Sequence, residues 1–185
     1  LAALLSTEAA LVAIAVQGAG LLLLAPRLDG NLLVTFNGAA LLVLVVANAL
    51  LGRPYEVRGV VARGDKRGRE LGFPTANVSV PGDVLLPADG IYAGWYERPD
   101  GAVHPTAISL GRRPTFYAEA HASLLEAHLL DFSGGLYDEH AKVRFVAWLR
   151  GEAKFASVDE LIAQIARDCD DARRILGGFD IESSR

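Results

Sequence analysis

The hydrophobic positions of the first 52 residues form two long uncharged runs. Residues 9–26 and 31–52 contain no Asp, Glu, Lys or Arg, and each run approaches the roughly 20 residues with which a helix spans a bilayer. The runs predict an apolar helical arm, and a transmembrane hairpin is one interpretation of it. Polar side chains such as Gln17 and Asn37 interrupt the runs, so a buried two-layer packing or a segment of a larger domain stays open.

After the arm, the pattern is typical of β-strands. Residues 55–62 (YEVRGVVA) alternate between apolar and polar positions, and residues 90–97 (GIYAGWYE) are rich in aromatic side chains. Further strand-like segments are AVHPTAISLG, ASLLEAHLLDF and AKVRFVAWLR, and the turns VPGD, RPDG and FSGG separate the segments. Several short strands at this spacing predict an antiparallel barrel or sandwich.

The last element has helical periodicity. Ser157 and Glu160 form a capping-box pattern, and apolar residues recur at helical spacing until Gly177-Gly178 ends the run. This predicts an amphipathic helix packed on the barrel, with Cys169 in its buried stripe. We therefore expect two parts, an apolar arm (residues 1–52) and a β-rich domain (residues 53–185).

Charge and cysteine content narrow the functional classes. All charged residues except Glu8, Arg27 and Asp29 lie in the second part, and the net charge of −4 with a pI near 5.6 argues against a nucleic-acid-binding surface. The lone Cys169 excludes an intramolecular disulfide and favours a reducing compartment. If the arm inserts as a hairpin, basic residues after Gly52 place the second part in the cytoplasm, and membrane contact involves residues 1–52 only.

The segment RGDKRGRELGFPTAN (residues 63–77) has a composition that core packing does not explain. Gly64 and Gly68 allow close approach of the backbone to an anion, and the surrounding basic residues add positive charge. An ordinary exposed turn would have a similar composition. Thr75 and Asn77 add hard oxygen ligands on one side of an extended segment, which suits Mg²⁺ bound together with ATP phosphates, although local hydrogen bonding in a turn is an alternative.

The segment GVVARGDKRGRELGFPTANV resembles the ATP-binding signature of riboflavin kinases (flavokinases). The segments LPADGIYAGW, AISLGRRPTF, LEAHLLDF and VRFVAWLRGEAKFASVDELIAQIARD follow the same family in the same order. The resemblance covers about residues 51–176, and LLGRPYEVRGVV resembles the junction after the FMN adenylyltransferase module of the bacterial bifunctional enzymes. It implies a six-stranded Greek-key barrel that transfers the γ-phosphate of ATP to the 5′-hydroxyl of riboflavin, giving FMN.

The resemblance also implies roles for individual residues. Thr75 and Asn77 would hold Mg²⁺, Glu126 would be the general base, and the segment from Gly64 to Leu71 would cover the phosphates of ATP. Arg113, Pro114 and Thr115 would line the active-site region, and the C-terminal helix and the loop after Phe132 would border the flavin. The complete nucleotide-binding set is Gly64, Lys66, Gly68, Arg69, Leu71, Gly72, Pro74, Thr75 and Asn77.

Strand alternation is compatible with the role of Glu126. Leu125, Ala127 and Leu129 face one side of a strand while Glu126 and His128 face the other, so the carboxylate points either into a cleft or to water. His128 is expected to be a partner or surface residue.

Two departures from the family pattern limit the interpretation. Family members commonly read Asp-Leu-Tyr-Gly where this chain has Gly135-Leu136-Tyr137-Asp138, and the arm lacks the histidine-containing loop of the adenylyltransferase. FAD synthesis is therefore not expected. A flavin- or nucleotide-binding module without turnover and a membrane-tethered scaffold remain alternatives, and retention of Thr75, Asn77 and Glu126 together favours the enzyme.

Overall fold

The computed structural model describes residues 48, 51–65, 67–112 and 123–178. The chain divides into two compact units, residues 1–55 and residues 56–185. The apolar runs of the arm fall almost wholly outside the described residues. Among the residues that are described, no helix is long and apolar enough to cross a membrane.

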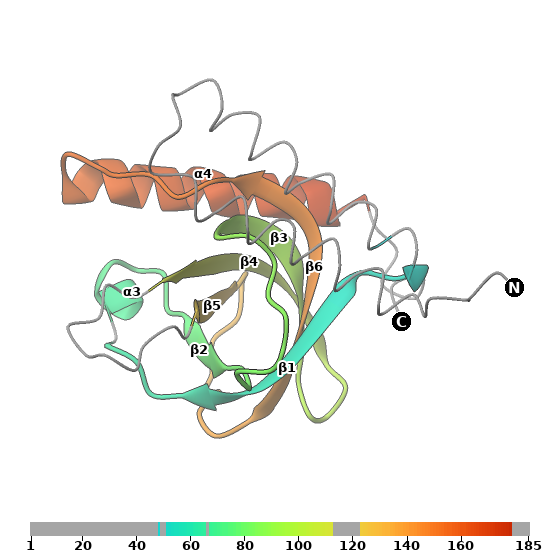
Figure 1. Cartoon of the computed structure of the whole chain (residues 1–185). Helices are drawn as coiled ribbons and strands as arrows, with labels where there is room; N and C mark the ends of the chain where they lie inside the picture. The colour runs from blue at the N-terminus through green and yellow to red at the C-terminus, as the bar shows by residue number, and fades with distance from the viewer. Residues whose placement is uncertain (1–47, 49–50, 66, 113–122, 179–185) are drawn as a thin grey trace, which may run out of the picture. The chain divides into compact units, whose positions relative to one another are not determined.

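The second unit contains a closed antiparallel barrel with the strand order β1-β2-β5-β4-β3-β6 (Figure 1). Strands β3, β4 and β5 follow one another as neighbours, and β6 returns to pair with β3, which is a Greek-key arrangement. The barrel expected from the sequence is thus confirmed. The strands are β1 (Tyr55–Ala62), β2 (Ala76–Ser79), β3 (Gly90–Glu97), β4 (Val103–Arg112), β5 (Ser123–Leu129) and β6 (His140–Arg150).

Alternating positions of these strands fill the barrel. Val57 and Val61 of β1, Ile108 and Leu110 of β4 and Leu125 of β5 are almost fully buried, as period-two alternation requires. The aromatic rings of Tyr92 and Phe145 meet edge to face with centroids 5.1 Å apart, which joins β3 to β6 within the core. The intervening positions face outward, where some pack under a helix, some line the site described below, and others form ion pairs or are exposed.

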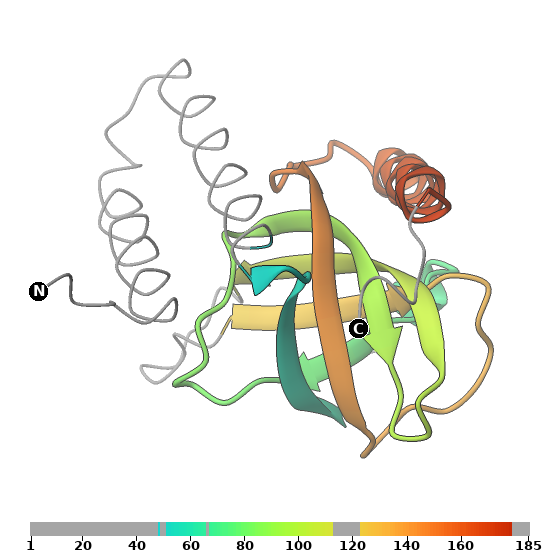
Figure 2. The ribbon, with the colours of Figure 1, turned by 90° about the vertical axis from the view of Figure 1, so that its right-hand side faces the viewer.

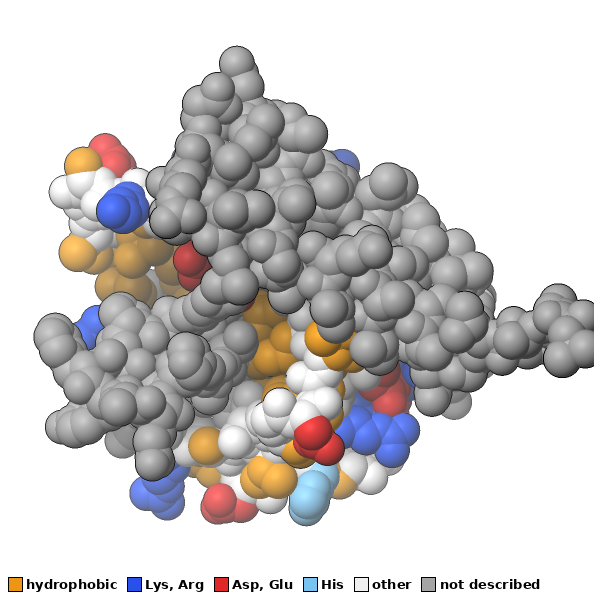
Figure 3. Space-filling model, in the orientation of Figure 1, with side chains coloured by type: hydrophobic (Ala, Val, Ile, Leu, Met, Phe, Trp, Pro, Cys, Tyr) orange, Lys and Arg blue, Asp and Glu red, His pale blue; other side chains and the backbone are white. Residues whose placement is uncertain are grey.

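Helix α4 (Val158–Leu176) lies against the outer face of β3, β4 and β6 (Figures 1 and 2). Its expected apolar stripe is confirmed, because Cys169, Ala172 and Leu176 are buried in a cluster with Trp95 of β3. Ser157 Oγ accepts the backbone N–H of Glu160 at 3.2 Å, so the N-cap is also confirmed. Hydrophobic side chains remain visible at the end of the molecule where α4 begins (Figure 3), and Val158 there is exposed.

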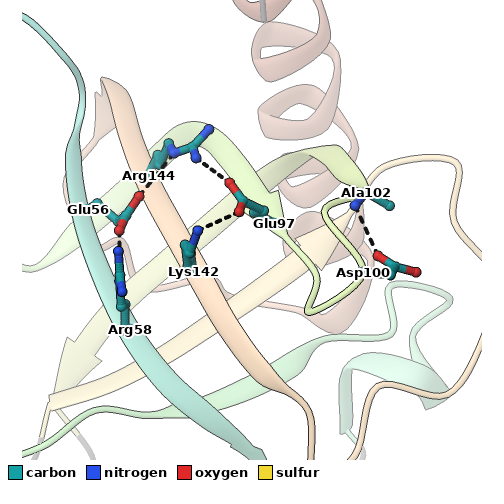
Figure 4. A network of polar contacts seen from close by, with 7 residues as sticks. All are labelled: Glu56, Arg58, Glu97, Asp100, Ala102, Lys142 and Arg144. Carbon is teal, nitrogen blue, oxygen red and sulfur yellow. Dashed lines mark hydrogen bonds and ion pairs between the residues drawn. The ribbon is translucent and has the colours of Figure 1, made fainter. Parts of the chain in front are cut away.

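An ion-pair network joins β1, β3 and β6 on the outside of the barrel (Figure 4). The buried Arg144 guanidinium binds Glu56 at 3.2 Å and also contacts Glu97, which accepts from Lys142 at 2.5 Å. Burial tends to raise the pKa of Glu56, but hydrogen bonds from Arg58 and Arg144 outweigh it and hold that pKa below its usual value. The network closes the seam between the first and last strands of the barrel.

The departure at residues 135–138 has a defined conformation. Asp138 has φ 65°, in the left-handed region where Gly is favoured, and its N–H donates to Val61 O at 2.9 Å. The family's usual Gly at this position is therefore explained by the backbone that the loop adopts. Asp tolerates this region better than most residues, so the loop keeps its connection to β1.

This conformation gives a stability prediction. We expect the Asp138→Gly variant to be more stable than the Asp138→Ala variant by about 1 kcal/mol, because Gly has no Cβ, whereas the Cβ of Ala crowds the backbone at positive φ. Urea unfolding followed by circular dichroism measures the difference. At Ser133, an exposed loop residue outside the left-handed region, the order should reverse and Ala should be more stable than Gly. If Gly were more stable than Ala at both positions, or less stable at both, the left-handed backbone at position 138 would not explain the difference.

Candidate active site

The segment between β1 and β2 forms a one-turn helix rather than the open glycine-rich turn expected from the sequence. Helix α3 (Arg67–Glu70) ends in a Schellman motif: Phe73 N–H donates to Gly68 O at 2.7 Å, and Gly72 N–H donates to Arg69 O at 3.2 Å. Gly72 has φ 88°, which explains why Gly occupies this position. The motif reverses the chain and directs Phe73 and Pro74 toward β2.

Gly64 and Gly68 allow the segment to lie directly on the two expected metal ligands. A Cβ at Gly64 would lie 2.3–2.7 Å from the carboxamide atoms of Asn77. A Cβ at Gly68 would lie 2.5 Å from the Phe73 carbonyl oxygen and 3.3 Å from Thr75 Oγ1. Real Cβ atoms essentially never make contacts below 3.0 Å, so this packing at Asn77 and at the Phe73 carbonyl favours glycine at both positions. The two glycines therefore pack against Asn77, Phe73 and Thr75, whereas the sequence had suggested only that they approach a bound anion.

Three polar side chains occupy one row across the barrel. Asn77 of β2 pairs with Glu126 of β5, and Glu126 pairs with Ser109 of β4. Directly paired residues point to the same face of a sheet with their Cβ atoms about 4.5–5.5 Å apart. This face is the outer one, since Val78, Leu125 and Ile108 on the opposite face are buried in the barrel. A carboxylate thus lies between an amide and a hydroxyl.

The row forms part of the wall of a large groove. The groove has a volume of about 1050 Å³ and is bounded by the α3 segment, the outer faces of β2, β5 and β4, and the first half of α4. Eight of the nucleotide-binding and catalytic residues expected from the sequence line it: Gly64, Gly68, Arg69, Leu71, Pro74, Thr75, Asn77 and Glu126. Gly72 is outside the lining and acts through the turn that it forms.

The opposite wall of the groove is mainly apolar and is built by β3, α4 and the β6–α4 connection. Leu161 and Ile165 of α4, Ile91 of β3 and Phe155 line it. Arg150 holds this wall together, because its Nε and Nη2 donate to both carboxylate oxygens of the buried Asp168, at 2.8 and 2.6 Å. The Arg150 guanidinium also lies over the Phe155 ring, with Cζ 5.8 Å from the centroid.

Cys169 borders the groove but is not a nucleophile at neutral pH. Burial raises the pKa of its thiol to about 11, so the thiolate is scarce near pH 7. This agrees with the expectation that Cys169 is a packing residue.

The residues present suit a magnesium ion bound together with phosphate. Asn77 Oδ1 is buried and has no hydrogen-bond partner among the described residues, so a hard oxygen acceptor remains unsatisfied next to Glu126. Mg²⁺ takes oxygen ligands and usually only one or two from the protein. Within the described ranges no three His, Cys, Asp or Glu side chains gather as a metal-binding cluster.

Some expected residues fall outside the described part of the chain, and some groove residues were missed. Lys66, Arg113, Pro114 and Thr115 lie outside it. Ser109 and Arg150 were not singled out from the sequence, because their place in the groove depends on strand register and on the packing of α4. The loop after Phe132 does reach the groove, through Tyr137, whose ring lies under the Arg63 guanidinium with Cζ 5.6 Å from the centroid.

Comparisons with known proteins agree with this geometry. A bifunctional riboflavin kinase/FMN adenylyltransferase from Listeria monocytogenes is 43% identical over 127 residues, which cover 69% of this chain and 40% of that protein. The crystal structure of riboflavin kinase from Trypanosoma brucei matches 68% of this chain and 82% of its own, with a TM-score of 0.52 and 25% identity. A Streptococcus pneumoniae structure named macrolide-efflux protein matches 70% of this chain and 42% of its own, with a TM-score of 0.65 and 33% identity.

The chain spans about two fifths of the length of the curated relatives that it matches. Residues 51–176 match the family model for flavokinase, described as riboflavin kinase, and on that match the chain belongs to the riboflavin kinase family.

Proposed function

We propose that this chain transfers the γ-phosphoryl group of ATP to the 5′-hydroxyl of riboflavin and produces FMN and ADP. The observation that carries the proposal is the pairing of Asn77 with Glu126 on adjacent strands of one groove, which places an unsatisfied amide oxygen beside a carboxylate. Membership in the riboflavin kinase family supports the choice of substrates. The size of the groove and its apolar wall, formed partly by α4, are compatible with a nucleotide and a flavin bound together.

In this proposal each part of the groove has a separate task. Asn77 and Thr75 hold Mg²⁺, which neutralises charge on the phosphate oxygens when it is bound. Arg67 and Arg69 of α3 also line the groove and add positive charge near the phosphates. The apolar residues of α4 and Phe155 hold the flavin so that its ribityl hydroxyl reaches Glu126.

Glu126 completes the transfer as a general base. The 5′-oxygen of riboflavin forms a bond to the γ-phosphorus, the bond from that phosphorus to the β–γ bridging oxygen breaks, and ADP leaves. The hydroxyl proton moves to the Glu126 carboxylate as the new bond forms, because a carboxylate is too weak a base to ionise a free alcohol beforehand.

A single assay tests the function. The full chain is incubated with riboflavin, ATP and Mg²⁺, and the products are separated by chromatography with fluorescence detection. We expect FMN, none in the presence of excess EDTA, and no FAD. Binding of both substrates without any FMN would instead indicate the non-catalytic binding module.

We also propose that residues 53–185 form the kinase domain. Deleting residues 1–50 should leave a folded protein with kcat for FMN formation within about threefold of the full chain, because the groove residues named above all lie beyond the deletion. Circular dichroism and the FMN assay measure the outcome. An unfolded product would show that the arm contributes to the core and that the boundary is misplaced.

A further inference from the structure

His128 connects the strand that carries Glu126 to the segment that leads into Thr75. Its Nδ1 lies 2.8 Å from the carbonyl oxygen of Pro74. A carbonyl oxygen can only accept, so Nδ1 carries the proton and donates it. The imidazole also meets the Phe73 ring edge-on, with centroids 5.6 Å apart and an interplanar angle of 76°. One side chain of β5 thus contacts two consecutive residues of the turn before β2.

The position of His128 in the strand register explains why a side chain is needed there. The β2–β5 ladder pairs Ala76 with Ala127 and Asn77 with Glu126, and the next step places Thr75 opposite His128. Pro74 comes directly before Thr75 and has no backbone N–H. It therefore cannot donate a hydrogen bond that would extend the ladder. The imidazole N–H supplies a contact to the Pro74 carbonyl where backbone pairing ends.

Fixing the Pro74 carbonyl also fixes the backbone of Thr75. The carbonyl oxygen and the Thr75 N and Cα belong to one planar peptide unit, so restraint of the oxygen restrains the plane. Gly68 approaches Thr75 Oγ1 from the α3 side. Thr75 therefore lies between Gly68 of α3 and the peptide restrained by His128, and it lines the groove.

We propose that His128 is a positioning residue, which orients Thr75 toward the metal and nucleotide through its hydrogen bond to Pro74. This inference rests on the proposed function for the identity of the ligand. His128 also lines the groove, so a direct role as the base is the competing explanation. The positioning role and the base role require different nitrogens of the imidazole. Positioning needs the N–H at Nδ1, whereas a base needs the unprotonated Nε2 to take a proton from the substrate.

Three variants of the full chain separate these roles. His128→Asn keeps an amide donor close to the place of Nδ1 and has no base, His128→Gln places its amide closer to Nε2, and His128→Ala removes both. Isothermal titration with Mg·ADP measures binding without turnover. We expect affinity in the Asn variant within about threefold of wild type, and losses of roughly 10–100-fold in the Gln and Ala variants, as for other residues that orient metal ligands.

Further measurements decide between the outcomes. ¹⁵N NMR of histidine-labelled wild-type protein should show Nδ1 protonated in the neutral imidazole, and thermal unfolding should show that all variants fold. Unchanged Mg·ADP affinity in the Ala variant, or equal losses in the Asn and Ala variants, would overturn the positioning role. FMN formation is scored separately: wild type that binds Mg·ADP but makes no FMN overturns the proposed function and leaves the His128 comparison valid, whereas wild type that does not bind Mg·ADP overturns both.

Discussion

The Glu126→Gln variant is expected to bind ATP and riboflavin as wild type does and to make FMN roughly 10² to 10⁴ times more slowly. Gln keeps the size of the side chain and one acceptor oxygen, so it preserves the row formed with Asn77 and Ser109. It cannot take the proton that the riboflavin hydroxyl loses as its oxygen bonds to phosphorus. The loss should therefore appear in the chemical step and leave the dissociation constants of both substrates nearly unchanged.

Single-turnover kinetics are the appropriate measurement, because slow product release can hide a defect in the chemical step. Asp83→Asn is a matched control that also turns a carboxylate into an amide: Asp83 is exposed between β2 and β3 and does not line the groove, so its variant should keep wild-type kinetics. If the Glu126 variant keeps a chemical step within a few fold of wild type, Glu126 only orients the hydroxyl. Catalysis would then depend on electrostatic stabilisation of the phosphates.

Local patterns predicted most of the barrel because its strands are amphipathic or aromatic and turn residues separate them. Strands β1, β3, β4, β5 and β6 all appear among the segments identified from alternation, and the cap and apolar stripe of α4 are correct. Strand β2 was treated only as an extended segment, since its four residues are too few for a periodic signal. Helix α3 was missed because the Gly72 turn, and not helix propensity, defines it.

The residues of the candidate site could be predicted where local motifs contain them, but not where their position depends on contacts distant in the sequence. Thr75, Asn77 and Glu126 belong to motifs that can be read along the chain. Whether Glu126 faces a groove or water depends on its partners across β2 and β4, which a single sequence does not specify. The hydrogen bond of His128 likewise joins residues 54 positions apart. These contacts follow from strand register and could not have been predicted from spacing.

Removing the amide oxygen of Asn77 should weaken the dependence on Mg²⁺ and reduce turnover while the fold persists. In Asn77→Ala we expect the Mg²⁺ concentration for half-maximal activity to rise roughly 10–100-fold, the range seen when residues that orient metal ligands are lost. Far-UV circular dichroism should be unchanged, because the backbone of β2 keeps its pairing to β1 and β5. A magnesium titration that matches wild type would exclude Asn77 from the metal site.

Gly64→Ala tests the same oxygen without removing any ligand atom. The added Cβ would lie 2.3–2.7 Å from the Asn77 carboxamide, so either the side chain of Asn77 or the α3 segment must move. The expected result is a shift of the magnesium titration in the same direction as for Asn77→Ala and smaller in size, because a displaced ligand can still be recruited when ATP binds. Gly82→Ala is the matched control, since a Cβ there meets no atom within 4 Å and its φ lies outside the left-handed region. The magnesium titration of Gly64→Ala could also match wild type while that of Asn77→Ala is shifted. This result would show that the α3 segment moves away and that Gly64 does not determine the position of the Asn77 side chain.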